Sequence, residues 1–284
     1  GEGESTAQTF QMSLVSGHYE QLLPEVGPGV VQMIQVKGTM LDGSTASYPQ
    51  NAADPWYQVF HGEVEPIYCT DFEASSDLSE WEDELLEGEE REGANDWMVG
   101  TPLGMSGSGD PTEAYSGDNV VGNDLGGGEY NGSYQPNKRN VLISPYIDVT
   151  GHENVRLQYR RWLNVEDGYY DQATIYANDG VAWTNLATVE NGSLHHEDRE
   201  WRFHDVDITE FIERGGMQIK YEINSDGGLE LGGWTIDDFC IVGFVPPALV
   251  EDDATQDAEG GDADGLDGEA GSGAKSGDEG CSAQ

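Results

Sequence analysis

The stretch GWTIDDFCIVGFV, residues 233–245, decides the fold class of this chain. β-Branched and aromatic residues dominate it, and these residue types favour a pleated, half-buried strand. Two adjacent acids, Asp237 and Asp238, interrupt the apolar run. We therefore expect one long strand whose middle carries charge.

Other segments repeat the strand pattern along the chain. Apolar residues alternate with polar ones over 217–223 and over 155–162, a period of two that is typical of strands with one buried face. Segments 172–177 and 200–208 are similar, whereas 208–215 is the one short helical candidate. Many strands and little helix predict an all-β, two-sheet jelly-roll sandwich.

Composition excludes several functional classes. The 284 residues include 55 Asp and Glu against 12 Lys and Arg, a formal net charge of −43. Binding to nucleic acid or to anionic lipid rests on basic side chains, so we expect neither partner. The sequence contains no run of 18 apolar residues, so we expect no transmembrane segment.

Changes of composition divide the chain into three parts. Residues 247–284 are acidic and glycine-rich without aromatic residues, which predicts a disordered linker or tail. Residues 67–246 hold the strands of the predicted jelly roll. Residues 1–66 hold a few strand-like segments separated by turn signals, which we interpret as a partial Ig- or fibronectin-like β module.

The chain contains three cysteines, Cys69, Cys240 and Cys281. An odd number in a chain that looks exported indicates one disulfide and one further thiol. A bridge between Cys69 and Cys240 would contribute roughly 5 kcal/mol in the chain-entropy view. The alternative is a pair of unpaired, buried thiols in a cytosolic protein.

A set of motifs in fixed order carries a family resemblance. CTDFE (69–73) opens the central segment and GWTIDDFC (233–240) closes it, with Asp96-Trp97, AYSGDNVVGNDLGG (114–127) and LISPYIDV (142–149) between them. This order resembles the MAM-like jelly-roll domain of bacterial surface proteins, also called choice-of-anchor J. It is also similar to the C-terminal domain of immune-inhibitor-A-type secreted metallopeptidases.

The resemblance implies a structural Ca²⁺ between the first and last strands. It places Glu73 and either Asp237 or Asp238 at the ion, where a hard cation would relieve the repulsion between neighbouring carboxylates. In the alternative interpretation these acids are solvated or bonded to loop amides.

Two acidic loops offer further cation chemistry. Asp118 and Asp124 lie in a loop rich in Asp, Asn and Gly, which is typical both of a second cation site and of an ordinary turn with left-handed residues. Glu166-Asp167-Gly168 with Asp171 forms a comparable loop. For both loops the turn is the favoured interpretation.

Four aromatic residues are the candidates for ligand binding. Trp162 shares a mixed strand face with arginines, Trp183 follows a turn, and Tyr169 and Tyr170 lie in an acidic loop. Exposed rings of this kind stack on sugar faces in jelly rolls of the carbohydrate-binding type. The alternative is that the tryptophans belong to the core.

We expect no catalytic residues in this chain. His195-His196-Glu197-Asp198 and His204-Asp205 contain zinc-binding residue types, but adjacent histidines in a strand point to opposite faces. The sequence has neither His-Glu-x-x-His nor Gly-x-Ser-x-Gly. An exposed loop followed by a strand is the simpler interpretation of the histidines.

Together these patterns predict a noncatalytic, calcium-stabilised binding or adhesion module of a secreted or cell-surface bacterial protein. Its expected partner is an extracellular protein or polysaccharide. One alternative is the accessory region of a secreted zinc metallopeptidase whose catalytic domain lies upstream, and another is a glycan-binding module. Cys281 follows an acidic linker as in a C-terminal sorting signal of exported proteins, which predicts surface anchoring there.

Overall fold

The computed structural model describes residues 7–74, 77–89, 95–107, 109–127, 131–189 and 193–246. The chain divides into two units, Gly1–Pro247 and Ala248–Gln284. The predicted tail, 247–284, and the predicted anchor Cys281 lie outside the described residues, so both stay predictions.

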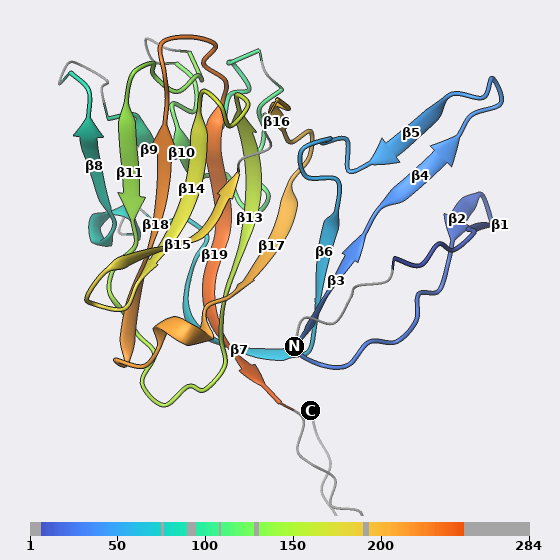
Figure 1. Ribbon diagram of the computed structural model, residues 1–284, viewed down its shortest axis with the longest axis horizontal. Coiled ribbons are helices and arrows are strands. Elements are labelled where there is room, and N and C mark those ends of the chain that lie inside the picture. Colours follow the sequence, from blue (N-terminus) through green and yellow to red (C-terminus); the bar gives the residue numbers. More distant parts are fainter. Residues whose placement is uncertain are drawn as a thin grey trace, which may run out of the picture. The chain divides into compact units, whose positions relative to one another are not determined.

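Two antiparallel sheets form the sandwich (Figure 1). One has the order β16 (His196–Glu197), β13 (Val155–Val165), β19 (Gly233–Val245), β10 (Val120–Asn123) and β9 (Trp97–Gly100), with β17 (Arg202–Asp207) on β13 and β7 (Glu63–Thr70) on β19. The other has the order β15 (Trp183–Val189), β14 (Gln172–Asn178), β18 (Gly216–Asn224), β11 (Arg139–Ile143) and β8 (Glu82–Glu87), with β12 (Ile147–Asp148) on β18. The predicted all-β, jelly-roll-like class is confirmed.

Side chains from both sheets fill the space between them. In β18, Met217, Ile219, Tyr221 and Ile223 are all buried, as the alternating pattern predicts. The rings of Tyr221 and Trp234 bring β18 and β19 together at a centroid distance of 5.2 Å. Burial of apolar side chains on both inner faces is the main force that holds the sheets together.

Helical structure in the described residues is limited to two short 3₁₀ turns. They are η1 (Asp77–Glu80) and η2 (Thr209–Phe211). The second replaces the helix expected over 208–215. Ile208 and Phe211 are buried there, so packing fixes one turn and the chain enters β18 soon afterwards.

The segment before the sandwich forms three two-stranded ribbons. They pair β1 (Ser13–Val15) with β2 (His18–Glu20), β3 (Val30–Ile34) with β6 (Tyr57–His61), and β4 (Val36–Thr39) with β5 (Thr45–Tyr48). The predicted boundary between 66 and 67 falls inside β7, which pairs with β19 along most of its length. The division into modules at this point stays a prediction.

A buried ionic cluster fastens residues 51–58 to the seven-stranded sheet. Asp54 lies 2.7 Å from Arg161 and 3.4 Å from Arg202. Asp198, which is fully buried, lies 2.9 Å from Arg161 and accepts a hydrogen bond from Asn51. Each buried charge of this cluster thus has a partner of opposite sign, and this pairing offsets the cost of removing the charges from water.

Candidate cation and ligand-binding sites

The opening and closing strands of the sandwich are covalently joined. Cys69 of β7 and Cys240 of β19 are register partners, and their sulfurs form a disulfide at 2.05 Å. The predicted bridge is therefore present. It holds Glu73, just after β7, near the acids that precede Cys240 in β19.

A β-bulge sets the direction of Asp237 and Asp238. The pairing of β19 with β13 shifts register here, with one extra residue on β19, and Asp238 has φ +46°. Ile236 and Phe239, three positions apart, both lie in the core. Because a bulge redirects side chains, both acids can reach the loop at 115–116, which strict alternation would not allow.

Asp237 is the most buried acid at this point, with no exposed surface. Its Oδ2 accepts hydrogen bonds from the backbone N–H groups of Tyr115 (2.9 Å) and Ser116 (3.0 Å). Burial, with a further contribution from the charge of Asp238, raises its pKa to about 6. Among the described residues no basic side chain forms an ion pair with it, and Arg160 opposite it stacks on Tyr115 instead.

Glu73 binds the next residues of the same loop. Its Oε1 accepts hydrogen bonds from the N–H groups of Asp118 (2.7 Å) and Asn119 (2.6 Å). Gly117 has φ +59°, and a Cβ there would lie 2.4 Å from this oxygen. A larger residue here would therefore have to displace the Glu73 carboxylate and adopt a left-handed backbone conformation.

The predicted calcium ligands, which lie on or just after the paired first and last strands of the sandwich, thus all contact loop 115–119. In the structure, the carboxylates of Glu73 and Asp237 accept hydrogen bonds from backbone N–H groups of this loop. The Asp238 carboxylate accepts a hydrogen bond from the Ser116 hydroxyl at 2.7 Å. Among the described residues, trios of potential metal ligands with donor atoms within 4.8 Å of one another occur elsewhere, around Glu166. The donor set here is made of oxygen atoms, as Ca²⁺ prefers. Calcium at Glu73, Asp237 and Asp238 stays a prediction.

Asp118 and Asp124, the second predicted pair of cation ligands, form hydrogen bonds with different parts of the chain. Asp118 is exposed and donates its N–H to Glu73. Asp124 is buried at φ +31°, and its side chain accepts the N–H of Gly126 within its own turn. This is the geometry of the turn interpretation; a cation at these two acids stays a prediction.

Trp162 is part of an aromatic row on the seven-stranded sheet. Its ring centroid lies 5.8 Å from that of Trp201, and its indole N–H donates to the Gly109 carbonyl at 3.0 Å. Tyr115 continues the row, 6.4 Å from Trp201. Trp162 is thus half-buried beside Trp201 and Gly109, whereas the sequence predicted an exposed ring.

Tyr169 and Tyr170 are exposed, as predicted. They lie in the connection after β13 and expose 75% and 53% of their surface. The N–H groups of both residues bond to Asp167. The loop therefore presents two rings to solvent from a hydrogen-bonded turn.

Trp183 lies on the outer face of the six-stranded sheet. Lys220 Nζ lies 4.7 Å from the Trp183 ring centroid and 4.2 Å from that of Tyr176. Glu222 lies next to it, 3.6 Å from Lys220 Nζ and 3.0 Å from Arg139. Burial lowers the pKa of Lys220. The sequence analysis missed Tyr176, Lys220 and Arg139, although the alternation of polar residues in 217–223 was a signal for this face.

The histidines His195, His196 and His204 differ in their exposure to solvent. The side chain of His195 is 42% exposed, whereas His196 is buried beside Asn51 in the ionic cluster. Burial, reinforced by the charge of Arg161, lowers the pKa of His196 to about 4. His204 is also buried, and burial holds its pKa well below the ordinary value. Both buried histidines are therefore neutral at pH 7 and belong to the packing of residues 51–58 against the sheet.

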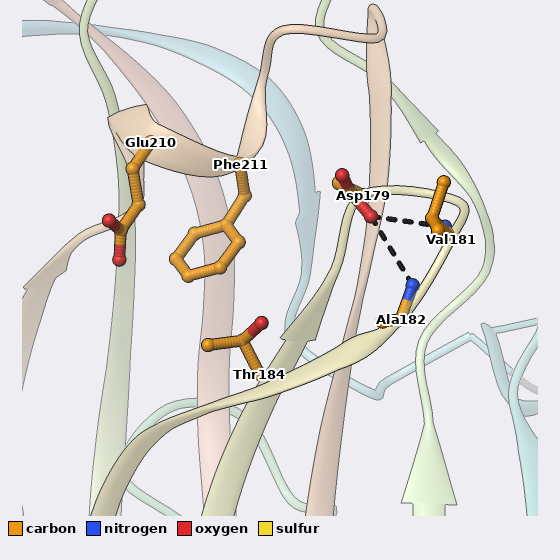
Figure 2. Close-up of a pocket in the computed structure, with 6 residues that line it drawn as sticks. All are labelled: Asp179, Val181, Ala182, Thr184, Glu210 and Phe211. Carbon is orange, nitrogen blue, oxygen red and sulfur yellow. Dashed lines mark hydrogen bonds between the residues drawn. The ribbon is translucent and has the colours of Figure 1, made fainter.

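A shallow pocket of about 260 Å³ lies between the β14–β15 turn and η2. Figure 2 shows its lining, in which Asp179 accepts hydrogen bonds from the N–H groups of Val181 and Ala182. These bonds lower the pKa of Asp179, so its carboxylate serves to close the turn. Thr184, Glu210 and Phe211 complete the wall, and none of the predicted site residues contributes to it.

Comparisons with known proteins give distant similarities. No family model matches this chain. Bacillopeptidase F of Bacillus subtilis (strain 168) is 27% identical over 144 residues, which are 51% of this chain and 9% of the relative. This chain thus spans about a tenth of the length of the curated relative it matches.

Solved structures with some similarity include adhesin and carbohydrate-binding modules. The K1 cleaved adhesin domain of Lys-gingipain from Porphyromonas gingivalis W83 is 18% identical at a TM-score of 0.39, covering 63% of this chain and 98% of that domain. TmCBM61, solved with β-1,4-galactotriose, is 13% identical at a TM-score of 0.36, covering 59% of this chain and 90% of that module. Similarities of this extent carry no argument about function. No helix in the described ranges is long and apolar enough to cross a membrane.

Proposed function

We propose that this chain is a noncatalytic, calcium-stabilised binding module of a secreted or cell-surface bacterial protein. Its partner is an extracellular protein or polysaccharide. The cross-strand disulfide supports an oxidising compartment, because such bonds persist outside the cytosol. The strongly negative net charge favours solubility and attraction of cations.

The observation that carries the calcium part of the proposal is the Asp237 carboxylate. It is fully buried next to Asp238, with Glu73 across loop 115–119, and the described residues offer it no basic partner. A buried carboxylate without a counter-charge is costly. A hard divalent cation would remove that cost and connect the first and last strands of the sandwich, with Glu73, Asp237 and Asp238 as its protein ligands.

A thermal melt tests the calcium site. Bound calcium raises the apparent stability by mass action, so the chain in excess Ca²⁺ should melt at higher temperature than in EDTA. Asp238→Asn should reduce this calcium-dependent shift, and Glu153→Gln, which removes an exposed charge elsewhere, should leave it unchanged. Identical melts in Ca²⁺ and EDTA, or a full shift in Asp238→Asn, would contradict the proposal.

The curated relative favours a second candidate, the accessory region of a peptidase. The name of that relative identifies a peptidase without naming a metal, so the zinc chemistry of our prediction has no support from it. An antibody against this chain, applied with a casein zymogram to the culture of the source organism, tests the association. A band with both the epitope and casein hydrolysis supports it; the epitope on an inactive polypeptide counts against it.

The outer face of the six-stranded sheet favours a third candidate, glycan binding. Trp183 and Tyr176 provide half-buried rings that a sugar face can stack on, while Lys220 and Glu222 are buried beside them and pair with each other. Affinity electrophoresis in gels that contain polysaccharide tests this face. Retardation lost in Trp183→Ala and retained in Tyr19→Ala, an exposed aromatic on β2, supports the candidate; equal retardation of both variants rejects it.

A further inference from the structure

The Gln58 side chain connects segment 51–58 to β17 through two hydrogen bonds. Its Oε1 accepts the backbone N–H of Asp205 at 2.8 Å. This bond fixes the orientation of the amide, so its Nε2 group faces His204 Nδ1, 3.4 Å away. Because an amide N–H can only donate, Nδ1 of the neutral His204 ring accepts. β6, which contains Gln58, lies beside β17 (Figure 1).

The Asn51 side chain makes an equivalent contact at the other end of the segment. Its Oδ1 accepts the N–H groups of Ala53 (3.0 Å) and Asp54 (3.2 Å), which fixes the orientation of this amide too. Its Nδ2 group lies within 3.4 Å of both ring nitrogens of His196. His196 Nδ1 also lies 3.1 Å from the Leu163 carbonyl, to which it donates its proton. Nε2 of the neutral ring is therefore the nitrogen that accepts from Asn51.

A proton added to either ring would turn an accepting nitrogen into a donor. The new N–H of His204 would face the amide N–H group of Gln58, and the new N–H of His196 would face that of Asn51. Two donors that face each other lose their hydrogen bond and stay unsatisfied while they are buried, which costs free energy. Release of the segment would remove this cost, because water would then accept from both groups.

The charges around the two rings already balance. Two arginines and two aspartates pair with one another in this buried cluster: Arg161, Arg202, Asp54 and Asp198. Asp54 Oδ2 lies 4.0 Å from Nε2 of each ring, but it already pairs with both arginines. Tyr159, stacked on His204 with ring centroids 5.5 Å apart, stays neutral because burial raises its pKa. A protonated ring would therefore add uncompensated positive charge to a buried site.

We propose that segment 51–58 detaches from the seven-stranded sheet in acid, because protonation of His196 and His204 removes its hydrogen bonds to both rings. The sandwich stays folded, held by its core and by the disulfide between β7 and β19, and the released segment uncovers the two histidines. The calcium and glycan proposals rest on other residues, so this inference stands apart from them.

The pH range of the release follows from the two rings. Burial lowers the pKa of His196 to about 4 and that of His204 well below its ordinary value while the segment is attached. Once uncovered, the rings return toward 6.5, so the released state binds more protons between pH 6.5 and pH 4. Attachment is therefore complete above pH 6.5 and weakens as the pH falls toward 4. At pH 5 the shift of His196 alone favours release roughly 20-fold relative to pH 7.

Pulsed electron paramagnetic resonance between two spin labels tests the release in the full chain. Ala52→Cys places one label on the exposed side of the segment, and Val181→Cys places the other on the sandwich, with Cys281→Ala to keep that thiol unlabelled. We expect one narrow distance distribution at pH 7 and a broad, longer one at pH 5. A reference pair, Glu153→Cys with Val181→Cys, has both labels on the sandwich and should keep its distribution at both pH values.

Two variants separate histidine protonation from the other effects of acid. Gln58→Glu offers a protonated His204 a carboxylate that can accept from Nδ1, so it should reduce the broadening at pH 5. Gln58 is half-buried at the edge of the contact, and the change keeps the shape of its side chain. His195→Gln alters the exposed neighbouring histidine and should release like wild type.

The labelled pairs define the results that would overturn the inference. An unchanged Ala52–Val181 distribution in wild type at pH 5 would show that acid does not release the segment. Equal broadening in wild type and Gln58→Glu would show that His204 does not control the release. Broadening of the Glu153–Val181 pair at pH 5 would also overturn it, because the sandwich itself would then have opened.

Discussion

Cys69 and Cys240 face each other across β7 and β19, and their bonded sulfurs join the first strand of the sandwich to the last. The bridge closes a sequence separation of 171 residues. Every long-range feature of the site near it, from Glu73 to the β19 bulge, depends on these two strands lying together. The disulfide therefore contributes to stability and also positions the acids.

Removal of this bridge should destabilise the chain strongly. In the chain-entropy view a cross-link over a loop of this length contributes roughly 5 kcal/mol, because it restricts the unfolded state. We expect the double variant Cys69→Ala/Cys240→Ala to unfold at a much lower guanidinium concentration than wild type. Cys281→Ala is the matched control and should unfold like wild type. Equal midpoints for the double variant and wild type would refute this prediction.

The ion pairs of Asp54 should hold residues 51–58 against the sandwich. Its carboxylate lies between Arg161 and Arg202, whose side chains are almost completely buried. Removing one partner of a buried ion pair costs about 3 kcal/mol or more, since charge is left uncompensated. Asp54→Ala should therefore lower the free energy of unfolding and speed limited proteolysis ahead of β7.

An exposed ion pair provides the comparison for Asp54. Glu197 and Arg199 are both 41% exposed, and such pairs contribute less than about 1 kcal/mol. Glu197→Ala should change neither the unfolding midpoint nor the cleavage rate noticeably. Equal effects of Asp54→Ala and Glu197→Ala would show that the buried cluster does not hold the segment.

His196 should make stability depend on pH in the acidic range. Its pKa falls from 6.5 in the unfolded chain to about 4 in the folded state, so the unfolded state binds more protons between these values. This contribution to stability is complete above pH 6.5 and is lost as the pH falls toward 4. Urea unfolding at pH 5 and pH 7 should show a smaller pH effect in His196→Gln than in wild type.

The comparison of variant with wild type is needed because carboxyls with raised pKa values, among them Asp96 and Asp237, act in the opposite sense. Burial raises the pKa values of Asp96 and Asp237 to about 6, so their contributions are complete below their unfolded value of 3.8 and are lost as the pH rises through 6. Both variants of the chain contain these carboxyls, and their effect cancels in the comparison. An unchanged pH effect in His196→Gln would exclude His196 as the cause.

Gly117 should be necessary for the site at loop 115–119. A methyl group there would meet Glu73 Oε1, so Gly117→Ala should displace this carboxylate and weaken calcium binding roughly tenfold, as loss of a supporting contact does at other metal sites. Gly151→Ala is the matched control: its φ is also positive, +88°, but a Cβ there meets nothing within 4 Å. Calcium titration that gives equal affinities for both variants would contradict the role of Gly117.

Local patterns predicted the strands and the disulfide well. The β19 segment was recognised over its full extent, and alternation in β18 identified its buried face, because both signals depend on neighbouring residues. The bulge at Asp238 was missed. Its extra residue is visible only when β13 pairs with β19, and that register is a tertiary property.

The contacts of the candidate site residues, like the bulge, could not be predicted from local sequence. Trp162 alternates like an exposed residue, yet it is half-buried, with its ring against Trp201 and its indole N–H bonded to the Gly109 carbonyl. The contact between Glu73 and Asn119 joins positions far apart in the chain, and no spacing rule predicts it. The acids around Glu166 were noticed as a loop, but Asp226 comes from a different connection, so the trio required the structure.

Anomalous diffraction from crystals grown in calcium chloride tests the central claim most directly, namely that an ion joins the first and last strands of the sandwich. We predict a calcium peak at loop 115–119, with carboxylate oxygens of Glu73 and Asp238 among its ligands. A map without a peak there, in which Glu73 and Asp237 still accept the N–H groups of that loop, would contradict it.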